Sequence, residues 1–305
     1  MSSLPARTSC RLALLFVLTA CGDRGRDAPD SSRSSLPALP PSGSVNATNW
    51  DTSTGPVMIL ALGEGDSVAI VLPQATDSTT TFEESSALES DLTVDLFGRA
   101  GKIASAAVIS PITRTAGAGE CRSWPAGRIR TSRSGWRVGF AAGRVTAVSL
   151  DSIEGMSSPD SSTLAAAIAQ TVAMLPSSSD SDFRGLPFRV RSAYTFRADS
   201  IDGVIADVVR SVNEEANPRL EHLFVIGERP AKSAMKYKVA FFSRIAGAEE
   251  AAEVTELLAV VLIGPTKRPA AIVNVEFDEG GTLGLIERTT PGRWRFRWRS
   301  AYTGC

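Results

Sequence analysis

The chain has 305 residues, 43% of them hydrophobic, and its 32 basic residues nearly balance 33 acidic residues to give a net charge of −1. A chain of this length and composition can bury a real core in one large or two small domains. The near-neutral charge gives no reason to expect nucleic acid as a partner, and we expect no cofactor.

The first residues have the pattern of an export signal. Arg7 and Arg11 precede the apolar run Leu12–Leu18, and the small residues Thr19 and Ala20 follow it. A basic stretch, a short apolar segment and small residues are the parts of a cleaved signal peptide. The alternatives are an ordinary secretory signal cut elsewhere or a transmembrane anchor, but the run is far shorter than the ~20 residues needed to span a bilayer.

The junction after this run is Leu18-Thr19-Ala20-Cys21, which resembles the lipobox of bacterial lipoproteins. The resemblance covers only the first twenty or so residues. It implies cleavage before Cys21, loss of residues 1–20 and a thioether-linked diacylglycerol on Cys21. Each buried CH₂ of an acyl chain contributes roughly 0.8 kcal/mol, so we expect the membrane to be a partner through this lipid. An Asp directly after the cysteine often retains lipoproteins of this kind in the inner membrane; here Gly22 occupies that position, which favours the outer membrane.

The mature chain would keep three cysteines, of which lipidation uses Cys21. Cys121 and Cys305 would then lie in an oxidising compartment, where pairing is expected. The bridge would close a loop of more than 180 residues, for which the chain-entropy model gives about 5 kcal/mol as an upper figure. Two buried thiols and a pair of metal ligands are the alternatives. Because no CxxC or HxxxH cluster accompanies the cysteines, we expect no metal site.

After Cys21, residues 21–50 are rich in Ser and Pro and form the expected tether, with a span of about 30 Å. Residues 51–155 are the expected N-terminal β subdomain, because short apolar runs alternate there with Gly-, Pro- and Asp-rich turn signals. Its expected strands are 57–62, 67–72, 92–97, 102–109, 126–131, 136–140 and 144–150.

Residues 156–185 are expected to be a helix and a linker. Leu164, Ile168, Val172 and Leu175 recur at helical spacing before Pro176 ends the run, which predicts one amphipathic helix over 158–175. Ser158 or Asp160 is the expected N-cap residue.

Residues 186–305 are the expected C-terminal antiparallel β subdomain. Its expected strands are 188–196, 220–226, 237–245, 270–277, 282–287 and 294–302. Residues 201–212 fit a helical stripe, but their valines and isoleucines favour a strand, which we predict. Residues 249–263 stay open between helix and strand. The predicted fold is therefore mainly β, at the margin of α+β, with two antiparallel β subdomains, each a small barrel or sandwich, joined through one amphipathic helix near 160–175.

The segment 293–299 alternates arginines with aromatic residues. In a strand, Arg293, Arg295, Arg297 and Arg299 would form one row and the aromatic residues the other. The row could bind an anionic glycolipid or another polyanion. The alternative is a solvated face whose arginines pair with acids such as Glu276, Asp278 and Glu287 on neighbouring strands.

His222 is the only histidine. On a strand it shares a face with Leu220, Phe224 and Ile226, a position more typical of a hydrogen-bonded core residue than of a catalyst. No GxSxG, EF-hand or phosphate-loop spacing occurs, so we assign no catalytic residue.

The sequence thus indicates a membrane-anchored envelope lipoprotein that binds a ligand or supports an assembly, without turnover. Its further partner would be another envelope protein or an anionic glycolipid. The alternatives are an envelope hydrolase that uses dispersed carboxylates or His222, and a polyanion binder that uses the four arginines of 293–299.

Overall fold

The computed structural model describes residues 58–61, 66–71, 93–112, 124, 126–131, 133–176, 180–198, 200–212, 218–233, 235–248, 253–277, 280–300 and 303. All of them fall within one compact unit of the chain. Cys21, Cys121 and Cys305, together with the signal and the tether, lie outside these residues. Within the described ranges, no helix is long and apolar enough to cross a membrane.

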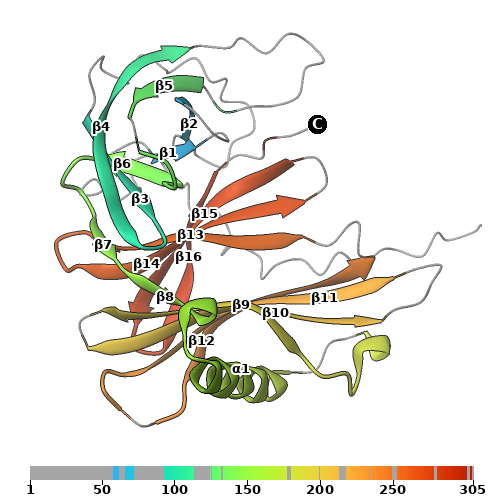
Figure 1. Ribbon diagram of the computed structural model, residues 1–305. Helices are drawn as coiled ribbons and strands as arrows, with labels where there is room; N and C mark the ends of the chain where they lie inside the picture. The colour runs from blue at the N-terminus through green and yellow to red at the C-terminus, as the bar shows by residue number, and fades with distance from the viewer. Residues whose placement is uncertain are drawn as a thin grey trace, which may run out of the picture. The chain divides into compact units, whose positions relative to one another are not determined.

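The first six strands close into a barrel in the order β1-β2-β5-β4-β3-β6 (Figure 1). Their bounds are β1 Met58–Ala61, β2 Ser67–Val71, β3 Thr93–Gly98, β4 Gly101–Ile112, β5 Ala126–Arg130 and β6 Val138–Ala141. Closure follows because β1 pairs antiparallel with both β2 and β6. One apolar cluster comes from the barrel region alone and includes Ile59, Leu96 and Ile129. Met58 and Phe97, which neighbour Ile59 and Leu96 in the sequence, belong to a second cluster that also contains residues of the later strands.

The remaining strands form two five-stranded antiparallel sheets. The central sheet has the order β16-β15-β14-β13-β7, and the outer sheet has the order β12-β11-β10-β9-β8. Bounds in the central sheet are β7 Thr146–Val148, β13 Val254–Ile263, β14 Arg268–Phe277, β15 Gly280–Thr290 and β16 Arg293–Arg299. Bounds in the outer sheet are β8 Leu150–Ser152, β9 Arg189–Ala198, β10 Ile201–Val212, β11 Arg219–Pro230 and β12 Lys238–Ala248. The predicted mainly β, antiparallel fold is confirmed.

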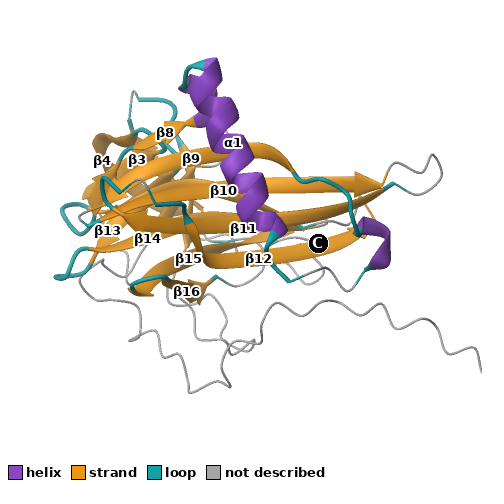
Figure 2. Ribbon diagram, turned by 90° about the horizontal axis from the view of Figure 1, so that it is seen from below, coloured by secondary structure: helices purple, strands orange, loops and turns teal. Residues whose placement is uncertain are grey.

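Three apolar clusters join these elements. Leu285 and other residues on one face of the central sheet pack with Met58 and Phe97 of the barrel. The opposite face, which includes Val273, packs with the outer sheet. The second face of the outer sheet packs against Ile168 and Val172 of the helix α1 (Ser158–Ala173), which lies across its strands in Figure 2.

Burial on both faces explains the two ambiguous segments. In β10, Ile205 faces the central sheet while Val204 and Ala206 pack in the α1 cluster. In β13, Val260 faces the outer sheet and Val261 packs in the cluster shared with the barrel. A strand buried on both faces is apolar throughout and loses the two-residue alternation that marks a half-buried strand. The predicted strand at 201–212 is confirmed, and 254–263 is a strand as well.

The helix α1 is confirmed, but its N-cap is Ser157, one residue before the expected Ser158. The Ser157 hydroxyl accepts a hydrogen bond from the Asp160 amide and donates to the Asp160 carboxylate at 2.6 Å. The chain continues through the short 3₁₀ helix η4 (Ser181–Phe183), whose Phe183 is fully buried. Another 3₁₀ helix, η3 (Ile153–Gly155), precedes α1.

The expected single strand 144–150 is wrong, because the chain changes sheets there. β7 pairs with β13 in the central sheet, and β8, after Ser149 alone, pairs with β9 in the outer sheet. Strand pairing therefore crosses the expected limit of the N-terminal subdomain at residue 155. The domain boundaries themselves stay a prediction.

Candidate functional site

A cavity of about 340 Å³ opens between the outer sheet and β13 of the central sheet. We call it the inter-sheet cavity. Its polar lining comes from three regions far apart in the sequence: the β3–β4 turn, strands β9 and β10, and strands β13 and β14. The lining residues that carry polar side chains are Arg99, Arg191, Ser192, Tyr194, Asp207, Thr255, Glu256 and Glu276.

Arg99 holds the barrel turn against both sheets at this cavity. Its Nη2 donates to Oε1 of Glu256 at 2.7 Å, and its Nε donates to the Leu257 carbonyl at 3.0 Å. The Arg99 guanidinium also lies 5.1 Å from the ring centroid of Tyr194 on β9. A second cation, Arg137, places Nη1 3.6 Å from the same Glu256 oxygen. Since these side chains are partly exposed, each pair stabilises the fold by at most about 1 kcal/mol, and its main effect is to fix the Glu256 carboxylate.

Asp207 and His222 form a buried pair at the cavity wall. His222 Nε2 lies 2.7 Å from Asp207 Oδ1, and the two residues are 2% and 8% exposed. Asp207 lines the cavity, whereas His222 stands behind it and does not. The expected position of His222, on the face of Phe224 and Ile226, agrees with this contact, because those residues pack between the sheets. The contact restricts the Asp207 side chain by packing, since neither of the two atoms makes a hydrogen bond of good geometry.

Two oppositely charged residues complete the lining. Arg191 and Glu276 are both exposed, and Glu276 accepts a hydrogen bond from Asn274 Nδ2 at 2.7 Å. The lining has two arginines and three carboxylates, and Arg137, which contacts Glu256 from outside the lining, brings the cations around the cavity to three. Such a wall suits a polar ligand that is neutral or zwitterionic, since neither sign of charge is in excess.

Sequence reasoning missed Asp207, although a signal was present. It is the single charged residue in the run Val204–Val209, and a carboxylate inside an apolar strand needs a polar partner. Arg99 and Glu256 carry no comparable signal. Their contact joins residues more than 150 positions apart.

The expected row of four arginines on β16 is wrong. Leu285 pairs with Trp298 and Ile286 with Phe296, so Arg297 is an extra, bulged residue that reverses the alternation. Trp298 consequently packs in the cluster shared with the barrel, whereas Trp294 packs against the outer sheet.

The last two arginines of β16 have different surroundings. Arg297 Nε lies 3.8 Å from a Glu287 oxygen, in agreement with the alternative of cross-strand pairing with acids. The Arg299 guanidinium instead stacks 4.0 Å from the Phe296 ring centroid. Arg293 and Arg295 are exposed. The four side chains do not form one cationic stripe.

Trp294 takes part in a polar node that links the two sheets. The Glu228 carboxylate of β11 accepts hydrogen bonds from Arg288 Nε at 2.8 Å, Arg288 Nη2 at 3.0 Å and Trp294 Nε1 at 2.9 Å, and from the Gly292 amide. Burial raises the pKa of Glu228, but these hydrogen bonds outweigh burial and hold the pKa below its ordinary value. Glu228 is therefore a buried, fully bonded anion.

Trp124 and Thr303 are described residues close in sequence to Cys121 and Cys305, which themselves lie outside the described residues. Trp124, three residues after Cys121, packs against the cluster that contains Leu283 of β15. Thr303, two residues before Cys305, exchanges two backbone hydrogen bonds with Gly281 of the same strand.

No family model, curated protein or solved structure matches this chain. In the part of the chain that the structure describes, no group of three His, Cys, Asp or Glu residues is placed to hold a metal ion.

Proposed function

We propose that this protein is an exported lipoprotein, held to the cell envelope by lipid on Cys21, whose folded part binds a small polar ligand without turnover. The anchor is supported by Leu18-Thr19-Ala20-Cys21 after a short apolar run, and Gly22 favours the outer membrane. A Cys121–Cys305 disulfide belongs to the same proposal. It is supported by Thr303, which pairs with Gly281 of β15, and by Trp124, which packs against the apolar cluster shared by the barrel and the central sheet.

The observation that carries the binding role is the set of close polar contacts on the wall of the inter-sheet cavity. Glu256 lies between Arg99 and Arg137, and Asp207 lies against His222. These contacts hold donors and acceptors in place before a ligand arrives, so that little side-chain ordering is left for the binding step. Because Arg99, Arg137 and Arg191 equal Asp207, Glu256 and Glu276 in number, the ligand class is a neutral or zwitterionic polar molecule.

Native mass spectrometry of the protein purified from its own envelope in non-ionic detergent tests this role. We expect the wild-type protein to retain a small molecule. Ser192→Trp, which fills the cavity, should abolish retention, whereas Ser134→Trp, at an exposed position in the barrel, should leave it unchanged. Equal retention by both variants, or no retained molecule in any of the three proteins, would contradict the proposal.

A hydrolase acting on an envelope polymer is the second candidate, because Asp207, Glu256 and Glu276 converge on one cavity. General acid–base catalysis needs a carboxyl group that reaches the substrate and exchanges a proton with it. The contacts of Glu256 with two arginines and of Asp207 with His222 favour binding instead. Release of soluble fragments from purified peptidoglycan by the wild-type protein, but not by Asp207→Asn, would replace the binding proposal with this one.

A further inference from the structure

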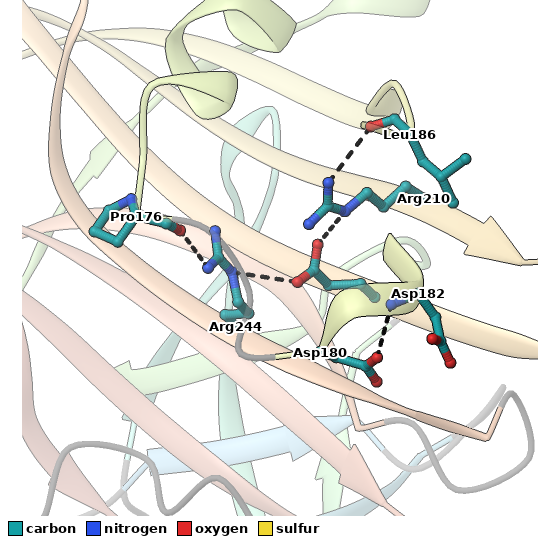
Figure 3. A network of polar contacts seen from close by, with 7 residues as sticks. Pro176, Asp180, Asp182, Leu186, Arg210 and Arg244 are labelled. Carbon is teal, nitrogen blue, oxygen red and sulfur yellow. Dashed lines mark hydrogen bonds and ion pairs between the residues drawn. The ribbon is translucent and has the colours of Figure 1, made fainter. Parts of the chain in front are cut away.

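A second cavity, of about 350 Å³, lies on the other face of the outer sheet, between the end of α1 and residues 180–188. We call it the arginine pocket. Its walls combine cationic and apolar side chains: Arg184, Arg210, Arg244, Val172, Leu175 and Phe188. Figure 3 shows Arg210 and Arg244 each approaching a different oxygen of one carboxylate, with the Leu186 and Pro176 carbonyls beyond them.

Arg210 and Arg244 share the carboxylate of Glu221. Arg210 and Glu221 are direct cross-strand partners on β10 and β11, and Arg210 Nε donates to Glu221 Oε2. Arg244 on β12 places Nε 3.6 Å from Glu221 Oε1. Glu221 is 0% exposed and the Arg210 side chain is 9% exposed. Two guanidinium groups thus meet one buried negative charge.

Cations exceed anions around the pocket. Asp180 and Asp182 both bind Arg219, whose guanidinium faces the Phe183 ring at 5.6 Å. The region therefore holds four arginines and three acids: Arg184, Arg210, Arg219, Arg244, Asp180, Asp182 and Glu221. Arg184 and Asp182 are exposed to water, but Arg210 and Arg244, whose side chains are 9% and 17% exposed, share the single buried carboxylate of Glu221, so one positive charge is in excess in that buried group. An excess charge in such surroundings is stabilised by a counter-ion.

The two arginines keep donors for that counter-ion. A guanidinium has five N–H groups, and Arg210 uses Nε on Glu221 and Nη1 on the Leu186 carbonyl. Arg244 donates from Nη1 to the Pro176 carbonyl and its Nε is buried 3.6 Å from Glu221 Oε1, so the donors left for a ligand are on Nη1 and Nη2. The rings of Phe183 and Phe188, 5.8 and 4.5 Å from the Arg210 guanidinium, fix its plane. Burial lowers the pKa of Arg244, Glu221 opposes this shift and Arg210 adds to it, as expected for a cation that lacks full compensation.

We infer that the arginine pocket binds a small organic carboxylate whose apolar body lies against Val172, Leu175 and Phe188. A carboxylate presents two coplanar oxygens that match the fork of a guanidinium. The apolar walls favour a ligand with a hydrocarbon body over a bare inorganic anion. This site lies on the opposite face of the outer sheet from the inter-sheet cavity and does not depend on the function proposed for that cavity.

Calorimetric titration of the full-length protein in non-ionic detergent tests the ligand class, with benzoate as the probe. Benzyl alcohol has nearly the same body without the charge, and inorganic phosphate has charge without the body. We expect benzoate to bind about tenfold more tightly than benzyl alcohol, as the loss of one charged hydrogen bond implies, and more tightly than phosphate, which has no apolar body to bury. Equal affinity for benzyl alcohol, or tighter binding of phosphate, would overturn the assignment.

Variants locate the site. Arg244→Gln should weaken benzoate binding about tenfold, whereas Arg197→Gln, which removes an arginine from β9 of the same sheet, should have no effect. Ala173→Trp keeps every charge and changes an exposed residue at the rim of the pocket, so it should block the ligand without unfolding the protein. If Arg244→Gln fails to fold, the benzoate affinity of Ala173→Trp alone tests the location of the site. Unchanged benzoate affinity in Ala173→Trp would refute the site.

Discussion

The Glu228 node offers a direct test of what holds the two sheets together. Glu228 is 7% exposed, and its carboxylate receives hydrogen bonds from Arg288, Trp294 and the Gly292 amide of the central sheet. In Glu228→Gln the side chain keeps its size but loses its charge, so Arg288, whose side chain is 18% exposed, loses its charged partner.

Breaking a buried ion pair costs about 3–5 kcal/mol. Because Arg288 keeps some contact with water, we expect the lower end of this range, about 3 kcal/mol of the free energy of unfolding. Asp151→Asn, at an exposed position on β8, should change it by less than about 0.5 kcal/mol. Urea denaturation followed by tryptophan fluorescence measures both variants. If Glu228→Gln lowers the free energy of unfolding by less than about 1 kcal/mol, the Glu228 node does not stabilise the packing of the two sheets.

The same node makes stability depend on pH. The folded-state pKa of Glu228 lies below its ordinary value of 4.5, so its contribution is complete above pH 4.5 and is lost as the pH falls through the lower folded value. The difference in urea midpoint between wild type and Glu228→Gln should therefore shrink as the pH falls below 4.5. A difference that stays constant through the acid range would contradict the assigned ionisation.

Three further changes test other parts of the structure. A Cβ added at Gly203 would lie 2.1 Å from Cζ of the buried Phe196, so Gly203→Ala should lower the free energy of unfolding by about 1–3 kcal/mol in a urea titration, and an unchanged midpoint would be inconsistent with this packing. Ser157→Ala removes the N-cap of α1 and should lower stability by about 1 kcal/mol, with Ser134→Ala as the neutral comparison. Peptide mapping without reductant should find Cys121 joined to Cys305, and reduction should lower stability by up to about 5 kcal/mol; free thiols at both positions would refute the bridge.

Most strands could be predicted because their signals are local. Runs such as Ser67–Val71 and Thr93–Gly98 are apolar segments closed by turn residues, and the amphipathic spacing and the following Pro176 defined α1. Strands β10 and β13 were harder to assign because apolar layers cover both of their faces. Whether such a buried segment forms a helix or a strand then depends on neighbours that are distant in the sequence.

The features missed by the sequence analysis depend on long-range pairing. The bulge at Arg297 depends on the register between β15 and β16, and the change of sheet at Ser149 depends on β9 and β13. The inter-sheet cavity likewise brings Arg99 of the barrel to Glu256 of the central sheet. Only the buried acid at position 207 had a local signal, as a charged residue within an apolar strand.

The central claim is that this protein is confined to a membrane by lipid on one sulfur atom. Intact-mass measurement of the protein purified from its native envelope tests it most directly. We predict a chain that begins at Cys21 and carries the added mass of a diacylglycerol, with or without a further acyl chain. An unmodified polypeptide, or a first residue other than Cys21, would contradict the account.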